Sequence, residues 1–209
     1  KEPDDANLVF NQAMALGAML TFATLAGGYL ATSWYMNLVG ADAATVAAGS
    51  AYLYWFLPGL ALQYVNMVMM SGLRGTGVVQ PTMVVQIATV LLNAALAPVL
   101  IAGIGTDKPM GVAGAGLAST ISVAAGTLML AGYMLRLEKY VHFRMPLWKP
   151  RAAVWARMIN IGAPAGGEFL LMFVFMAVIY WVIRDFGAAA QAGFGLGTRL
   201  MQSIFLPAM

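Results

Sequence analysis

Six long hydrophobic stretches, separated by short polar connections, dominate the amino-acid sequence. A bilayer core about 30 Å thick requires roughly 20 apolar residues in a helix that rises about 1.5 Å per residue. The stretches all meet that length, and they lie at residues 8–40, 44–72, 78–104, 111–135, 158–183 and 187–209. They predict an all-α, polytopic transmembrane helical bundle of about six membrane helices.

The composition agrees with a protein that is surrounded by membrane lipid. Hydrophobic residues make up 61% of the 209 residues and charged residues only 9%, whereas about 25% are charged in a typical soluble domain. The sequence has no cysteine and a single histidine, His142. This composition excludes disulfides, thiolate metal sites and His-rich metal clusters, and we expect neither a metal nor a cofactor.

Positive charge is concentrated in one connection, residues 136–157, which holds six of the eleven Lys and Arg residues. The positive-inside rule places such a segment in the cytoplasm, and the loops 40–44, 104–111 and 184–187 then lie outside. We therefore expect a multi-pass protein of the cell inner membrane. The net charge of +3 does not indicate a nucleic-acid partner, because no segment is long enough to hold these cations on a soluble domain.

The turn and helix-packing signals are equally clear. The segment 71–81 contains three glycines, Arg74 and a terminal Pro81, and it predicts a sharp cytoplasmic turn. It is not a phosphate-binding loop, because no Lys-Ser/Thr follows and no strand precedes it. Pro58-Gly59 predicts a kink in its helix. The small residues of GVAGAGLAST, from Gly111, indicate close approach of a neighbouring helix.

Four segments in order, RGTGVVQP, NAALAPVLIAGIG, GVAGAGLAST and GAPAGGEFLL, resemble motifs of the multidrug and toxic compound extrusion (MATE) transporters. Their order and approximate spacing match over residues 71–170. The resemblance implies a two-lobe transporter with six helices in each lobe, of which this chain is about half. Residues 1–135 correspond to four helices of the N-terminal lobe, 136–157 to the basic inter-lobe loop, and 158–209 to the first two helices of the C-terminal lobe.

The resemblance also implies a function. It implies secondary active export of organic, often cationic, compounds in exchange for H⁺ or Na⁺, by a monomer that is not an enzyme and that contacts small-molecule drugs and membrane lipid. Two positions depart from the family pattern. Ala97, in the stretch from Asn93 to Pro98, stands where an acid is usual, and Met172 stands where one branch of the family has a glutamate about one turn deeper than Glu168.

Glu168 is the candidate ion-coupling residue. It follows Arg157 by eleven residues, about 16 Å of helix, so it reaches as deep as the middle of the bilayer. A carboxylate there costs a few kcal/mol or more unless it is protonated, paired or hydrated. Three interpretations remain open: an acid that loads and releases the coupling ion, an ion pair with Arg199 at a similar depth on the next helix, and a residue in water facing the cytoplasm.

The backbone around Glu168 carries further expectations. Pro164, Gly166 and Gly167 precede it and predict a broken or loosened helix, which is tolerated at membrane depth where the backbone faces a cavity. Glu168 would then lie within the first turns of a helix, where its charge could also compensate the positive helix N-terminus.

Five amide side chains are candidates for lining a substrate cavity: Gln63, Asn66, Gln86, Asn93 and Gln191. The alternative is that they form interhelical hydrogen bonds worth about 0.6 kcal/mol each. Two other functions are alternatives to export. A lipid-linked oligosaccharide flippase would require a strongly cationic cavity, and only Arg199 and Arg74 approach membrane depth. A membrane-embedded enzyme would require a second catalytic group beside Glu168.

Overall fold

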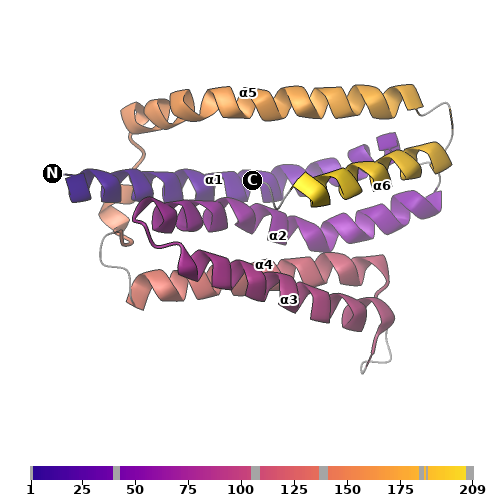
Figure 1. Cartoon of the computed structure of the whole chain (residues 1–209), viewed down its shortest axis with the longest axis horizontal. Helices are drawn as coiled ribbons and strands as arrows, with labels where there is room; N and C mark the ends of the chain where they lie inside the picture. The colour runs from indigo at the N-terminus through magenta and orange to yellow at the C-terminus, as the bar shows by residue number, and fades with distance from the viewer. Residues whose placement is uncertain are drawn as a thin grey trace. The chain divides into compact units, whose positions relative to one another are not determined.

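The protein is predominantly helical in the part of the chain that the computed structural model describes, residues 2–39, 43–104, 109–136, 141–183, 186 and 188–205 (Figure 1). The elements are α1 (Glu2–Val39), α2 (Ala43–Gly75), α3 (Gln80–Ala102), α4 (Val112–Arg136), the 3-10 helix η1 (Met145–Trp148), α5 (Ala152–Ile183) and α6 (Ala188–Phe205). In the described residues, α1 to α5 are long and apolar enough to cross a membrane. The predicted all-α class is confirmed, while a membrane span at α6 stays a prediction.

The helices follow the predicted hydrophobic stretches, but the first and the fifth helix each begin earlier in the sequence than predicted. The first helix begins at Glu2 rather than at residue 8, because the acidic residues of this first turn are favourable at a positive helix N-terminus. The fifth begins at Ala152 rather than at residue 158. The carbonyl of Arg151 accepts the first helical hydrogen bonds, from the N–H groups of Val154 (3.0 Å) and Trp155 (3.1 Å). Part of the basic connection is therefore helical.

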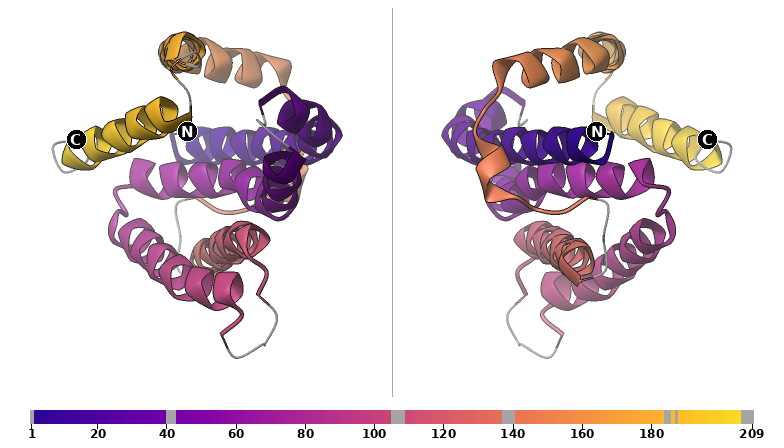
Figure 2. Two further views of the ribbon diagram at one scale, coloured as in Figure 1. Left: turned by 90° about the vertical axis from the view of Figure 1, so that its right-hand side faces the viewer. Right: turned by 90° about the vertical axis from the view of Figure 1, so that its left-hand side faces the viewer.

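The chain forms two compact units, Lys1–Trp155 and Ala156–Met209. In the first unit, α2 packs between α1 and α4, and α3 packs mainly on α4 (Figure 2). The described part of the connection after α4 belongs to this unit, because η1 packs on α1. We call residues 141–151 the linker. The assignment of 1–135 and 158–209 to two lobes of a larger protein stays a prediction.

Small residues allow the close packing of α4, as its sequence predicted. A Cβ atom added at Gly116 would lie 2.6 Å from the carbonyl oxygen of Tyr52 in α2. One added at Gly114 would lie 2.6 Å from the carbonyl oxygen of Leu100 in α3. Both distances are far shorter than a carbon–oxygen contact, so α4 approaches the backbones of two neighbours at once. Glycine is therefore required at both positions.

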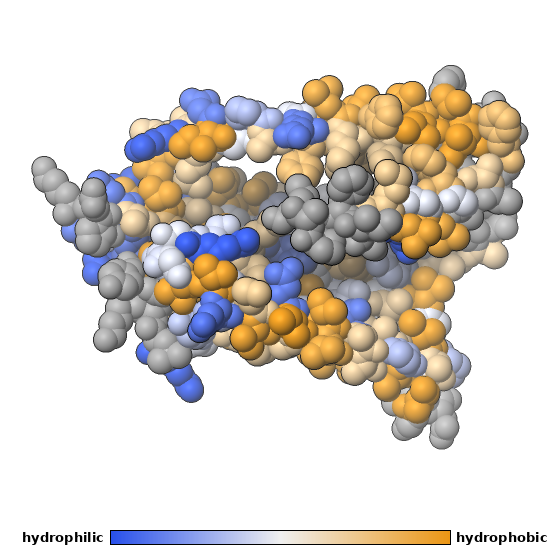
Figure 3. Space-filling model, in the orientation of Figure 1, coloured by the Kyte–Doolittle hydropathy of each residue, from blue (hydrophilic) through white to orange (hydrophobic). Residues whose placement is uncertain are grey.

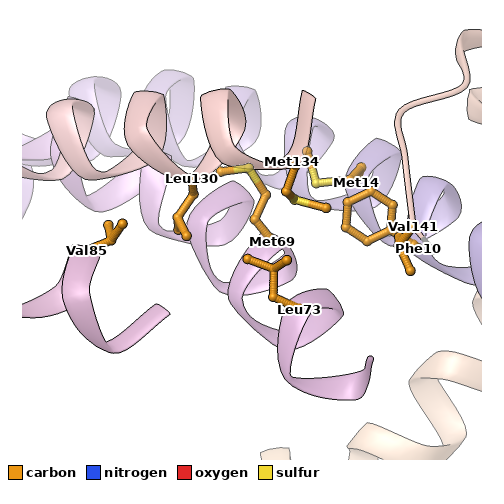
Figure 4. Packing of buried hydrophobic residues seen from close by; sticks show 8 residues of the cluster. All are labelled: Phe10, Met14, Met69, Leu73, Val85, Leu130, Met134 and Val141. Carbon is orange, nitrogen blue, oxygen red and sulfur yellow. The ribbon is translucent and has the colours of Figure 1, made fainter. Parts of the chain in front are cut away.

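The buried hydrophobic core of the first unit lies at the end where α1 and α3 begin and α2 and α4 end (Figure 4). Its members come from the four helices and the linker: Phe10, Met14, Met69, Leu73, Val85, Leu130, Met134 and Val141. Much of the remaining apolar surface is exposed, for example 85% of Leu30 and 73% of Leu128, and hydrophobic residues cover much of the visible face over α3 (Figure 3). Exposed apolar surface of this extent is what a helix presents to lipid.

Helix α2 continues through Pro58, and its neighbours bind the backbone groups that the proline disturbs. Proline has no N–H, so the carbonyl of Tyr54, four residues earlier, lacks its helical donor. The hydroxyl of Tyr29 in α1 donates to this carbonyl at 3.1 Å. From α4, the Thr120 hydroxyl accepts from the Gly59 N–H at 3.0 Å and donates to the Trp55 carbonyl. Pairing of such groups is required in a medium without water.

Candidate functional site

Glu168 lies on the exposed surface of α5, in the second unit. It follows Ala152, the first residue of the helix, by 16 positions, or about 24 Å along the axis. Two expectations about this residue are therefore wrong. The helix is continuous through Pro164, Gly166 and Gly167, and Glu168 is far beyond the first turns, so it does not compensate the helix N-terminus.

The reason for both errors is local. Glycine and proline lower helix propensity by about 1 and 3 kcal/mol, yet the apolar residues on both sides preserve the hydrogen-bond ladder of α5. A Cβ atom added at Gly162, Gly166 or Gly167 would meet nothing within 4 Å among the described residues. Among the described residues, packing therefore does not require glycine at these three positions. Arg199 lies in α6, and the three interpretations of Glu168 stay open.

The predicted cavity residues occupy different environments. Gln63 and Gln86 are exposed on α2 and α3. Asn66 is buried, at 7% exposure, and its Oδ1 atom has no partner among the described residues. Asn93 donates through Nδ2 to the Ser119 hydroxyl at 3.3 Å, which joins α3 to α4. The side chain of Gln191 lies outside the described residues. A shared substrate cavity for these five residues stays a prediction.

A groove of about 790 Å³ lies at the turn between α2 and α3 and continues between α3 and α4. Its lining is mainly apolar and includes Val79, Pro81, Val84, Met129 and Tyr133. None of the five predicted cavity residues lines it. The turn itself is confirmed: Gly77 has φ of 82°, a value that favours glycine, and Pro81 is in the first turn of α3.

The most extensive polar site of the described chain was not predicted. Three amide side chains of α1, from Asn7, Asn11 and Gln12, are 4%, 0% and 0% exposed. We call these three residues the amide clamp, because they bind the backbone of the linker. Figure 2 shows the linker, with η1, crossing the beginning of α1.

Asn11 is at the centre of the amide clamp. Its Nδ2 atom donates to the carbonyls of Asn7 (2.8 Å) and His142 (2.9 Å). Its Oδ1 atom accepts from the N–H of Arg144 (2.8 Å) and from the indole N–H of Trp148 (3.1 Å). The hydrogen-bonding capacity of this side chain is thus fully used, which removes the cost of burying it.

The neighbouring amides extend the contact to both ends of the linker. The Asn7 side chain accepts from the N–H of His142 at 3.0 Å. Gln12 donates to the carbonyls of Leu147 and Lys149, the latter at 2.8 Å, and accepts from the N–H of Arg151 at 2.9 Å. The only signal in the sequence is three amides at adjacent positions of one helix face, and their partners are backbone groups that side-chain patterns do not reveal.

Comparisons with known proteins cover the whole chain. The family model MatE matches residues 1–99. A FAD transporter of Shewanella oneidensis is 27% identical over 98% of this chain and 45% of its own length. The probable multidrug resistance protein YoeA of Bacillus subtilis is 24% identical over 93% and 44%. The multidrug export protein MepA of Staphylococcus saprophyticus is 26% identical over 90% and 40%.

Solved structures share the fold. A MOP superfamily transporter from Pyrococcus furiosus aligns with a TM-score of 0.79 and 22% identity, over 97% of this chain and 49% of the other. An inward-facing multidrug resistance transporter of the MATE family aligns with a TM-score of 0.62 and 19% identity, over 78% and 43%. The chain spans about half the length of the curated relatives and of the solved structures that it matches.

The long apolar helices define an integral, multi-pass membrane protein. The family match over residues 1–99 and the curated relatives agree with the resemblance found in the motifs, and the chain is similar to transporters of the MATE family. Within the described ranges, no three acidic or histidine side chains come together in a way that could hold a metal ion.

Proposed function

We propose that the protein containing this chain is a secondary active multidrug exporter of the inner membrane, which expels organic, often cationic, compounds in exchange for H⁺ or Na⁺. The observation that carries this proposal is the alignment of 90% or more of the chain with relatives named as multidrug resistance and multidrug export proteins. The four motifs, in the family's order, support it. The basic connection of residues 136–157, which includes the linker, lies on the cytoplasmic side in this proposal, because it holds six of the eleven Lys and Arg residues.

The mechanism requires two states that open to opposite sides of the membrane. An ion drives transport only if its affinity differs between those states. Glu168 is the acid that we assign to this role, because it is the acidic residue that lies farthest from both ends of an apolar span. Loading it neutralises a charge at bilayer depth, and releasing the ion restores that charge at an unfavourable position. The free-energy difference biases the exchange between the two states.

A second substrate class is favoured by one relative. The protein of Shewanella oneidensis that aligns with 98% of this chain is named as a FAD transporter. FAD is a large anion with an aromatic ring system, so it differs from an organic cation in charge but shares its flat apolar surface. Both classes should therefore be offered to the protein in the same assay.

The proposed function predicts gradient-driven export by the full-length protein. We would reconstitute it in sealed vesicles and follow a fluorescent organic cation and FAD under separately imposed H⁺ and Na⁺ gradients. We expect one of the two gradients to drive accumulation of the cation, and an ionophore that collapses this gradient to abolish it. Empty vesicles are the control. Accumulation that needs no ion gradient, or none for either substrate, would refute the proposal, and accumulation of FAD alone would establish the second class.

A further inference from the structure

The linker is attached to α1 by hydrogen bonds to the buried side chains of Asn7, Asn11 and Gln12. The amide clamp binds six of its backbone groups, at His142, Arg144, Leu147, Lys149 and Arg151. Val141 belongs to the core of the first unit, and Phe143 and Trp148 pack against that core. The Phe143 ring also lies against that of Phe10, with the ring centroids 5.6 Å apart.

The attachment continues directly into α5. Gln12 accepts the N–H of Arg151, and the carbonyl of Arg151 accepts the first two hydrogen bonds of α5. The boundary between the two compact units falls just beyond this point, between Trp155 and Ala156. Side-chain amides of α1 thus fix the position at which α5 begins.

We propose that Asn11 and Gln12 are positioning residues for the transport cycle. They keep the linker on α1, so that the linker moves with the first unit as one body, and relative movement of the two units is taken up within α5 beyond Arg151. This inference rests on the proposed export function. The part of α5 that follows supports it, because Gly162, Gly166 and Gly167 lower helix propensity there and no packing contact among the described residues requires glycine at these positions.

A covalent bond between α1 and the linker tests the proposal directly. The 209 residues contain no cysteine, so in a full-length protein whose other cysteines, if any, are replaced by serine, the double variant Phe10→Cys/Phe143→Cys introduces one pair at positions whose native side chains are in contact. We expect export of the organic cation to be the same after oxidation as before it. If oxidation stops export and reduction restores it, the linker must leave α1 during transport, and the proposal is wrong.

Loss of the amide clamp gives the second test. Asn11→Leu leaves the N–H of Arg144 and the carbonyl of His142 without their partner, so we expect the linker to detach and the export rate to fall at least about fivefold, the lower limit of typical coupling between sites. Binding of the cation to the solubilised protein should not change. Asn37→Leu is the matched control, because this amide of α1 is exposed and bonds only to the Ser33 carbonyl one turn earlier.

Rescue separates positioning from a purely structural role. In the triple variant Asn11→Leu/Phe10→Cys/Phe143→Cys, oxidation reattaches the linker and should restore export to the level of the double variant. Failure of this rescue in a folded protein would overturn the proposal. If Asn11→Leu does not fold, the double variant still decides the question. If the unmodified protein exports neither cation nor FAD, the proposed function fails instead, which distinguishes the two outcomes.

Discussion

We expect Glu168→Gln to abolish most gradient-driven export by the full-length protein, because we propose this acid as the ion-coupling residue. Glutamine has nearly the same shape as glutamate but can neither bind a proton nor carry the charge that attracts Na⁺. The two states of the transporter then lose the ion-dependent free-energy difference between them. Typical coupling free energies of 1–3 kcal/mol correspond to factors of about 5 to 150, and we expect a decrease in this range for uptake of the cation into inverted vesicles under the effective gradient.

The control for this variant is Asp5→Asn, which removes one negative charge from the exposed first turn of α1. It should leave the gradient dependence unchanged, because Asp5 is not at bilayer depth.

Arg199→Gln distinguishes coupling from a structural ion pair. If Glu168→Gln and Arg199→Gln lower thermal stability equally while export keeps its gradient dependence, the acid is structural and the coupling role is wrong.

Thr120→Val strongly destabilises the first unit. The Thr120 hydroxyl joins the Gly59 N–H to the Trp55 carbonyl in α2, and valine has the same shape without a polar group. One of these hydrogen bonds is partly buried and the other is at an exposed position, where lipid or detergent supplies no replacement partner. At about 1–3 kcal/mol for each backbone group left without a partner, we expect the two together to lower the free energy of unfolding by about 2–6 kcal/mol. The Gly59 N–H and the Trp55 carbonyl cannot simply form the usual helical hydrogen bond with each other. Helix α4 already approaches Gly59 so closely that an added Cβ would lie 2.8 Å from Cα of Thr120.

Thr127→Val provides a matched control in the same helix. The Thr127 hydroxyl donates only to the Val123 carbonyl, four residues earlier in α4, and that carbonyl keeps its place in the helical ladder when the hydroxyl is removed. We expect the free energy of unfolding of Thr127→Val, measured by denaturant titration in detergent micelles, to differ from that of the unmodified protein by less than about 1 kcal/mol. Equal stability of Thr120→Val and Thr127→Val would show that the hydroxyl does not replace a ladder bond in α2.

Much of the fold follows from the sequence because bilayer thickness imposes a minimum length on each apolar stretch. Hydropathy does not report where a helix continues into polar sequence, and for this reason the starts at Glu2 and Ala152 were missed. The small residues of α4 were interpreted correctly, since close helix approach in lipid depends on them directly. The position of Pro58 in the sequence shows that the Tyr54 carbonyl lacks its helical N–H donor. It does not show that the Tyr29 hydroxyl donates in its place.

The candidate sites were less predictable, for a physical reason. Asn7, Asn11 and Gln12 act through backbone groups that are 131 to 139 residues away in the sequence, and backbone groups carry no residue-specific signal. Glu168 was identified because an acid in an apolar span is costly anywhere. Its local environment was predicted incorrectly, because propensities of single glycines and prolines do not decide whether a long apolar helix breaks.

The side of the membrane on which the linker lies tests the account most directly. Single cysteines replace Lys149 in the linker and Pro109 in the connection before α4, both exposed positions. The 209 residues contain no cysteine, and any cysteine elsewhere in the full-length protein is replaced by serine. A membrane-impermeant maleimide is applied to intact cells that express the full-length protein. We expect Pro109→Cys to react at once and Lys149→Cys to react only after permeabilisation. Reaction of Lys149→Cys in intact cells would place the linker outside and contradict the proposed orientation.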